Sequence, residues 1–158
     1  MNTLLVRLSS MGDLIHTLPA ITDLARHRPD VQLDWLCEAA FADIARLHPF
    51  IRRVHEMRWR YWRKHLFQAA TRQDIRRLQR SLKAAHYDRV LDSQGLIKSA
   101  LFANFAAAPV HGLDKHSARE PLAALFYQHR YPVAKDQPAV ERNRQLFAQA
   151  FGYTPQGT

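Results

Sequence analysis

Residues 3 to 27 read TLLVRLSSMGDLIHTLPAITDLARH. An apolar run typical of a buried strand is followed by the polar turn SSMGD and then by a helical pattern. The apolar positions of that helix recur at the expected spacing: Leu14, Leu18, Ile21 and Ala25. Pro19 lies about one turn in, so we expect a kink or a late helix start there. This strand–turn–helix unit predicts an α/β fold.

The same alternation continues along the chain. Further strands are predicted at VQLDWLCE, IRRVHEM, DRVLDSQG and PVHGLD. Further helices are predicted at FADIARLH, TRQDIRRLQRSLKAAHY, LIKSALFANFAA, REPLAALFYQHR and PAVERNRQLFAQAFG, with Thr71 capping the second of these. Repeated β–α units with short connections indicate a Rossmann-like parallel sheet with helices on both faces. We assign residues 1–150 to this domain, and the tail that follows, residues 151–158, is typical of the start of a linker.

Length and composition indicate one globular domain with an ordinary core. The chain has 158 residues, of which 47% are hydrophobic and 10% aromatic. The single cysteine, Cys37, excludes a disulfide framework and a cysteine-based metal site. The N-terminal apolar run is interrupted by Arg7 and is too short for a signal peptide or a membrane span. We therefore predict a cytoplasmic location.

The positive charge is concentrated in one segment. Residues 52–83 contain eleven Lys and Arg against two acidic residues, whereas the rest of the chain has twelve of each kind. Such a concentration is typical of an anion-binding surface, although a solvated basic helix face explains part of it. We find no RNP-like strand, no GXXG loop and no helix-turn-helix pattern, so no sequence motif supports nucleic acid as a partner.

The densest part of this segment is RWRYWRKHLF, residues 58–67. On a helix, three cations would share one side: Arg60, Arg63 and Lys64. Three apolar side chains would share another: Trp59, Trp62 and Leu66. Like charges at this spacing repel by about 0.2–0.5 kcal/mol per pair, and a bound carboxylate or phosphate would reverse that cost. The stretch therefore allows four interpretations: a nucleic-acid-binding surface, a membrane-surface patch, a pocket for an anionic ligand, or a basic helix face exposed to solvent.

The SSMGD turn is the first candidate for catalysis. It has one glycine, Gly12, and neither of the phosphate-binding patterns GxGxxG and GxxxxGKS. Asp13 repels phosphate, but a helix N-terminus favours its ionised form, as a general base requires. Alternatively, Asp13 only stabilises the first helical turn.

Further candidates follow two other predicted strands. Lys98 and Ser99 could face a ligand after DSQG, although Ser99 could equally pack inside. Arg119 directly precedes a predicted helix start, where a cation is misplaced unless an anion binds, while Glu120 suits the first turn. The nine histidines show no HxH or HxxxH spacing, so no metal site is predicted.

Five stretches together resemble the N-terminal half of the bacterial lipopolysaccharide heptosyltransferases, most closely those of type I. They are SSMGDLIHTLPA, RYWRK, YDRVLDSQGLIKSA, SAREPLAALFY and AVERNRQLFA, in the family's order and over nearly the whole chain. The resemblance implies the N-terminal domain of a GT-B glycosyltransferase, in which two Rossmann-like domains face a cleft. The N-terminal domain takes the acceptor and the C-terminal domain takes the donor.

The resemblance also implies a reaction and its site. L-glycero-D-manno-heptose would pass from ADP-heptose to Kdo of Kdo2-lipid A, with inversion and without a metal or other cofactor, at the cytoplasmic face of a Gram-negative inner membrane. Asp13 would be the catalytic base. The remaining matched residues would bind the acceptor: Arg60, Arg63, Lys64, Arg119, Arg142, Ser10 and Gly12.

Such enzymes are about twice as long as this chain. We therefore expect the donor-binding domain to be absent, and the chain alone to bind acceptor without transferring heptose unless a donor domain is supplied in trans. The alternative is a non-catalytic module that binds anionic glycolipid or nucleic acid.

Overall fold

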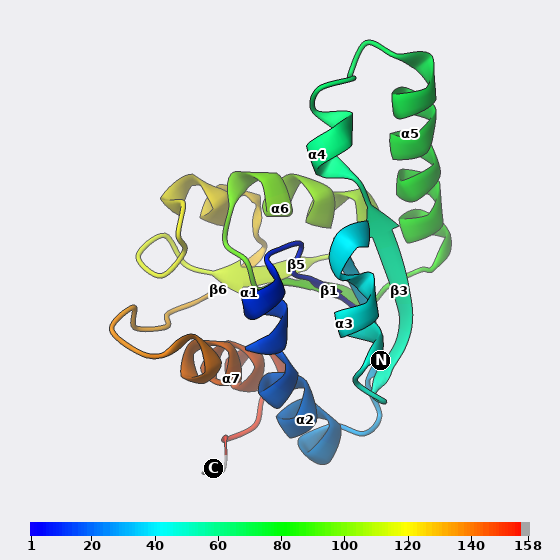
Figure 1. Cartoon of the computed structure of the whole chain (residues 1–158). Coiled ribbons are helices and arrows are strands. Elements are labelled where there is room, and N and C mark those ends of the chain that lie inside the picture. The colour runs from blue at the N-terminus through cyan, green and yellow to red at the C-terminus, as the bar shows by residue number, and fades with distance from the viewer. Residues whose placement is uncertain (156–158) are drawn as a thin grey trace.

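The computed structural model of the chain describes residues 1–155, so the last three residues of the predicted linker lie outside the described part. Six parallel strands form one sheet in the order β3-β2-β1-β4-β5-β6 (Figure 1). They are β1 Asn2–Val6, β2 Gln32–Glu38, β3 Ile51–Met57, β4 Arg89–Asp92, β5 Val110–Leu113 and β6 His129–Tyr131. This order confirms the Rossmann-like prediction and places the topological switch point between β1 and β4.

Helices cover both faces of the sheet (Figure 1). They are α1 Met11–Ile15, α2 Leu18–His27, α3 Ala42–Arg46, α4 Trp59–Trp62, α5 Ala69–Ala84, α6 Ile97–Ala103 and α7 Ala139–Phe151, with 3-10 turns η1 Ala39–Phe41, η2 Asn104–Ala106 and η3 Pro121–Phe126. Successive β1 residues alternate between two cores, because strand side chains point to opposite faces. Leu5 joins the core beneath α2, α3 and α7. Leu4 and Val6 join the core beneath α5 and α6.

Most predicted elements are present, with differences that have local causes. The first predicted helix is divided, and Pro19 lies in the first turn of α2, as expected for a residue without an N–H to donate. Thr71 was wrongly predicted as a cap: α5 begins two residues earlier, at Ala69, and Thr71 is buried within it.

The predicted helix REPLAALFYQHR is also wrong. Pro121 starts the short 3-10 turn η3 instead, and the last residues of the stretch begin β6. Tyr127 lies between the two, where its ring covers Gly112 of β5 so closely that a Cβ there would overlap it. This contact favours an extended chain after η3 over a continued helix.

Helices α4 and α5 form an arm, residues 58–84, that rises beyond the sheet at the end of β3 (Figure 1). Only one helical turn forms in the stretch 59–67. Trp62 is buried, Trp59 stacks edge-on against Phe102 of α6, and Leu66 is exposed. The predicted apolar side of this stretch therefore holds for the two tryptophans but not for Leu66.

A buried carboxylate holds the start of the arm. Glu38, at the end of β2, is 5% exposed, and its Oε1 accepts a hydrogen bond from the Trp59 N–H at 3.2 Å. Burial raises the pKa of Glu38, while the charges of Lys98 and Arg60 and the Trp59 N–H oppose that rise. Glu38 thus occupies the electropositive N-terminus of α4 and fixes the direction in which the arm leaves the sheet.

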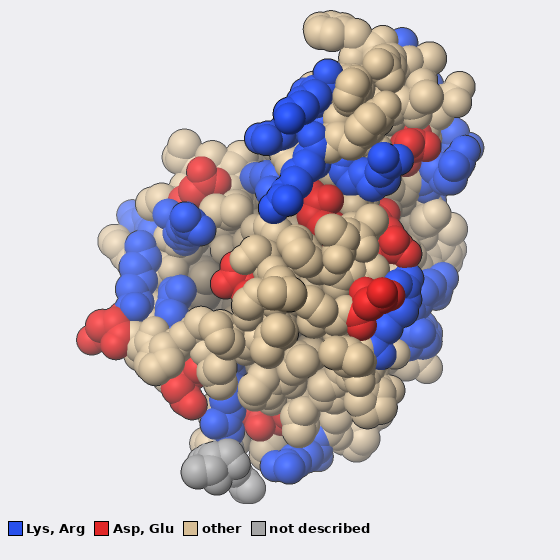
Figure 2. All heavy atoms as spheres, in the orientation of Figure 1, with Lys and Arg blue, Asp and Glu red and all other residues tan. Residues whose placement is uncertain are grey.

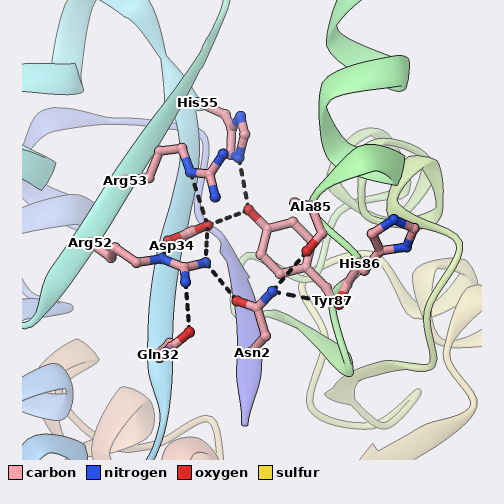
Figure 3. Close-up of polar contacts among 9 residues, drawn as sticks. All are labelled: Asn2, Gln32, Asp34, Arg52, Arg53, His55, Ala85, His86 and Tyr87. Carbon is pink, nitrogen blue, oxygen red and sulfur yellow. Dashed lines mark hydrogen bonds and ion pairs between the residues drawn. The ribbon is translucent and has the colours of Figure 1, made fainter.

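Two arginines of the basic segment, Arg52 and Arg53, contact a buried carboxylate at the amino end of the sheet (Figure 3). Asp34 of β2 is fully buried and accepts two hydrogen bonds from Arg52, both at 3.0 Å. The Tyr87 hydroxyl donates to the same carboxylate at 2.6 Å, and His55 Nε2 lies 2.8 Å from that hydroxyl. Arg53 approaches Asp34 at 3.5 Å. Arg52 and Arg53 therefore balance a buried charge rather than await a ligand.

The first prediction concerns pH and His111 of β5. Burial lowers the pKa of His111 from 6.5 to about 4, and nearby Arg89 and His129 act in the same direction. As the pH falls below 6.5, the unfolded chain takes up this proton and the folded protein does not, so the free energy of unfolding falls. Between pH 7 and pH 5 we expect this residue to contribute a loss of about 1–2 kcal/mol in urea unfolding.

The control for that measurement is His111→Gln. This variant lacks the titrating ring, so its unfolding free energy should change less between the two pH values than that of the wild type. Equal pH dependence in the two proteins would contradict the prediction.

The second prediction concerns Glu38 and the arm. Glu38→Ala removes the acceptor for the Trp59 N–H, so we expect amide hydrogen exchange across α4 to accelerate about tenfold, the size expected for loss of a helix cap. Glu38→Gln keeps an acceptor oxygen and should restore most of the protection. Glu56→Ala, an exposed carboxylate on β3 that pairs with Arg46, is the matched control and should leave α4 exchange unchanged.

Candidate functional site

The site lies at the carboxyl edge of the sheet, where the turn after β1 leads into α1. Ser10 is the N-cap of α1, and its backbone N–H donates to Asp13 Oδ2 at 3.1 Å. The Ser10 hydroxyl approaches the same oxygen at 3.4 Å. Asp13 therefore does stabilise the first turn. Its side chain nevertheless stays 42% exposed, so the carboxylate is also accessible to a substrate.

The second partner of Asp13 is Arg7, directly after β1. Arg7 Nη2 lies 3.4 Å from Asp13 Oδ1, and Arg7 Nη1 donates to the Ser93 carbonyl. The Arg7 side chain is 13% exposed, and burial lowers the pKa of its guanidinium. This residue bridges the β1 and β4 ends at the switch point, and it orients the Asp13 carboxylate. Sequence reasoning noted Arg7 only as a charge that interrupts an apolar run and missed this role.

A cavity of about 340 Å³ opens beside this pair. It brings together three of the predicted residues, Asp13, Arg119 and Arg142, and does not include the arm cations Arg60, Arg63 and Lys64. It also adds polar residues that sequence reasoning missed: Arg7, Gln94, Lys135, Gln137 and Asn143. Four cations and one carboxylate line it, which makes the cavity attractive to anions. Figure 2 shows a hollow left of centre, with Lys and Arg atoms along its outer side.

Arg119 and Arg142, the two predicted arginines in the cavity, differ in how many hydrogen bonds their side chains make. Arg142, in the first turn of α7, donates from Nη2 to the Ser117 carbonyl at 2.7 Å and from Nε to the Ala134 carbonyl at 3.1 Å. Burial lowers its pKa. Arg119 is exposed, and within residues 1–155 its side chain makes no hydrogen bond or ion pair. Arg142 thus shapes the cavity wall, and Arg119 is free to contact a ligand.

Glu120 has a role that sequence reasoning did not foresee. It precedes the 3-10 turn η3 as its N-cap, rather than lying in the first turn of a long helix. Its carboxylate accepts a hydrogen bond from the Ile97 N–H at 2.9 Å, and so occupies the N-terminus of α6. Its own N–H donates to the Gly95 carbonyl at 3.0 Å. Glu120 therefore ties the Arg119 loop to the loop after β4.

Ser99 packs inside rather than facing a ligand. It is fully buried, and its hydroxyl donates to Asp92 Oδ2 at 2.8 Å. Tyr127 donates to the same oxygen. Lys98 is half-buried and lies close enough to Glu38 to oppose the rise of that residue's pKa. Ser99 therefore belongs to the scaffold, and the charge of Lys98 acts on the carboxylate that holds the start of the arm.

The other predicted site residues are exposed and do not line the cavity. Gly12 lies in α1 with open space where a Cβ would stand. Arg60, Arg63 and Lys64 are all exposed on the arm. Across residues 1–155, no three His, Cys, Asp or Glu side chains gather into a group that could hold a metal ion. No helix in this range is long and apolar enough to cross a membrane.

Two solved heptosyltransferases share the fold of this chain. The chain superposes on E. coli heptosyltransferase WaaC with ADP-2-deoxy-2-fluoro heptose at a TM-score of 0.96 and 44% identity, covering 100% of this chain and 51% of that one. E. coli ADP-heptose lps heptosyltransferase II shares the fold at a TM-score of 0.72 and 21% identity, covering 93% of this chain and 40% of that one.

Curated relatives and a family model agree with this likeness. Lipopolysaccharide heptosyltransferase 1 of Pseudomonas aeruginosa is 53% identical over 97% of this chain and 43% of its own length. The protein of that name in Escherichia coli K12 is 45% identical over 98% of this chain and 49% of its own length. The chain thus spans about half the length of these relatives. Residues 75–158 match the model of glycosyltransferase family 9 (heptosyltransferase), and the chain belongs to that family.

Proposed function

We propose that this chain forms the acceptor-binding and base-supplying part of a heptosyltransferase of lipopolysaccharide core synthesis. The full reaction would transfer L-glycero-D-manno-heptose from ADP-heptose to Kdo of Kdo2-lipid A. The donor would be bound by a second domain, corresponding to the length of the relatives that this chain does not span. ADP-heptose would act as a co-substrate, and no metal or other cofactor is assigned a step.

One observation supports this function above the others: an accessible carboxylate, Asp13, stands at the edge of a cation-lined cavity. A surface built only to hold an anion gains nothing from a carboxylate in its lining, since the two would repel each other. A general base needs such a group, and the neighbouring Arg7 offsets its charge. The arrangement thus favours a catalytic site over a simple anion-binding module.

The proposed chemistry is a single displacement. A Kdo hydroxyl attacks the anomeric carbon of the heptose, a C–O bond forms there, and the bond to the ADP phosphate oxygen breaks with its electron pair. Asp13 accepts the hydroxyl proton. A carboxylate is a weak base toward an alcohol, so the proton moves late, as the new C–O bond forms. Attack from the face opposite ADP inverts the configuration.

The cations would bind the acceptor in two groups. Arg119 and Arg142 lie in the cavity beside Asp13 and would hold the carboxylate of the reacting Kdo. Ser10 and Gly12 lie in the same turn as Asp13, and the open space at Gly12 could take the sugar. On the arm, Arg60, Arg63 and Lys64 would hold more distant carboxylates or phosphates. Binding of that anion would relieve their mutual repulsion.

The third prediction tests the arm. In calorimetric titration with soluble, deacylated Kdo2-lipid A, the variant Arg60→Ala/Arg63→Ala/Lys64→Ala should bind at least tenfold more weakly than the wild type, because charge-assisted contacts are lost. The matched control is Arg76→Ala/Arg80→Ala/Lys83→Ala, which removes the same charge from exposed positions on α5 and should bind nearly normally. Equal losses in both triple variants, or equal binding of DNA and glycan by the wild type, would identify a nonspecific basic surface.

The fourth prediction tests the base. When the chain is supplied with a donor-binding domain, Asp13→Asn should lower kcat by about 10²–10⁴-fold, the usual cost of losing a general base. Asparagine retains an oxygen for the Ser10 N–H, so the turn should still form, and thermal stability should fall only by the small contribution of a partly exposed ion pair with Arg7. Acceptor affinity should not fall, because the lost charge repels the anionic acceptor. Asp43→Asn, a fully exposed aspartate of α3, is the control and should leave kcat unchanged. A normal kcat in Asp13→Asn would remove this residue from the mechanism.

A further inference from the structure

The far end of the arm exposes a group of apolar side chains to solvent. The arm tip, residues 61–68, consists of the end of α4 and the connection from α4 to α5, at the top of Figure 1. Phe67 is 96% exposed, and Leu66 and Tyr61 are each 42% exposed. An isolated exposed leucine is ordinary, but a phenylalanine with almost no covered surface, next to two more apolar side chains, favours a partner that removes it from water.

The surroundings of the tip are basic. Between residues 58 and 83 there are nine Lys and Arg and only one acid, Asp74. All nine cations are exposed: Arg58, Arg60, Arg63, Lys64, Arg72, Arg76, Arg77, Arg80 and Lys83. In Figure 2 the far end of the arm is formed by uncharged residues, and Lys and Arg atoms follow its flanks. The partner must therefore offer an apolar interior beneath a negatively charged surface.

A bilayer that contains anionic phospholipid has both properties. Apolar side chains enter the boundary between headgroups and acyl chains, while Lys and Arg stay at the level of the phosphates. Phe67 and Leu66 are adjacent in a short loop, so they can enter together without unfolding α4 or α5. Trp62 is already buried in the fold and is not part of the inserted group.

We propose that the arm tip is a membrane anchor, in which Leu66 and Phe67 insert into an anionic bilayer and the flanking cations contact its headgroups. The choice of a bilayer as partner rests on the proposed function, because an acceptor that carries lipid chains lies at a bilayer surface. It goes beyond that function in assigning apolar residues of the arm to the bilayer rather than to the glycan. The same arm would then hold the acceptor's anionic groups at headgroup depth.

The test is co-sedimentation with vesicles that contain no acceptor. The chain should partition onto phosphatidylcholine vesicles with about one third phosphatidylglycerol, and much less onto pure phosphatidylcholine. Phe67→Ser should reduce the partition coefficient for anionic vesicles by roughly ten- to a hundredfold, the range expected for a lost phenylalanine insertion. Leu125→Ser, on η3 and 71% exposed, is the matched control and should bind like the wild type.

Two parallel measurements separate this inference from the proposed function. Phe67→Ser should bind soluble, deacylated Kdo2-lipid A with unchanged affinity, because the glycan has no acyl chains. Loss of vesicle binding with intact glycan binding supports the anchor. Glycan binding that fails in the wild type as well sinks the proposed function and leaves the anchor standing on the vesicle result.

Other occupants of the tip give different outcomes. Vesicle binding that survives Phe67→Ser, or that is equal on neutral and anionic vesicles, overturns the anchor. A wild type that is dimeric by sedimentation velocity, and that Phe67→Ser converts to a monomer, overturns it too, since a second copy would then cover the tip. Circular dichroism melting should be the same for both proteins, because Phe67 is exposed and contributes little to folding stability.

Discussion

The geometry of the site depends on one buried carboxylate, Asp92, at the end of β4. It is fully buried, and it accepts hydrogen bonds from Ser99, Tyr127 and the Gln94 N–H. These contacts join the start of α6 and the end of η3 to the strand end. The neighbouring carbonyl of Ser93 holds Arg7, and Arg7 holds Asp13. Burial raises the pKa of Asp92, so the donors around it are required to keep a charge there. The Asp13 carboxylate is thus positioned, through Ser93 and Arg7, by a second carboxylate that is fully buried.

The arm is also positioned by a buried carboxylate at the end of a strand. Glu38 is buried at the end of β2, and it accepts the N–H at the start of α4. The arm is therefore anchored at its base and exposed at its tip. Three cations on so short a helical segment repel one another, and the packing of Trp59 and Trp62 on Phe102 offsets that repulsion. Binding of an anion would then add to a conformation that the free chain already holds.

Sequence patterns predicted the sheet because buried parallel strands are continuous apolar runs, as in Leu4–Val6, and because the α5 stripe has a clear helical period. They also singled out Asp13, which lies beside Arg7 at the cavity, while its role as a general base stays a prediction. They missed Lys135 and Gln94, because these line the cavity only after distant loops converge. They overestimated the length of α4 and of the helix after Arg119, because tertiary contacts of Trp62 and Tyr127 decide where those segments turn. The arm cations were assigned a ligand through family resemblance, since charge alone allowed several partners.

The positive charge of residues 52–83 divides by location into different physical tasks. Arg52 and Arg53 compensate buried Asp34, so they add to stability and offer little to a partner. The nine cations of the arm are exposed and have one acid among them. Salt screens exposed charges over about 8–10 Å, so electrostatic attraction at the arm falls with ionic strength, whereas insertion of Phe67 does not. Stable binding to an anionic bilayer therefore requires both electrostatic attraction and apolar insertion. The charge sets the rate of association, and the apolar contact sets the rate of dissociation.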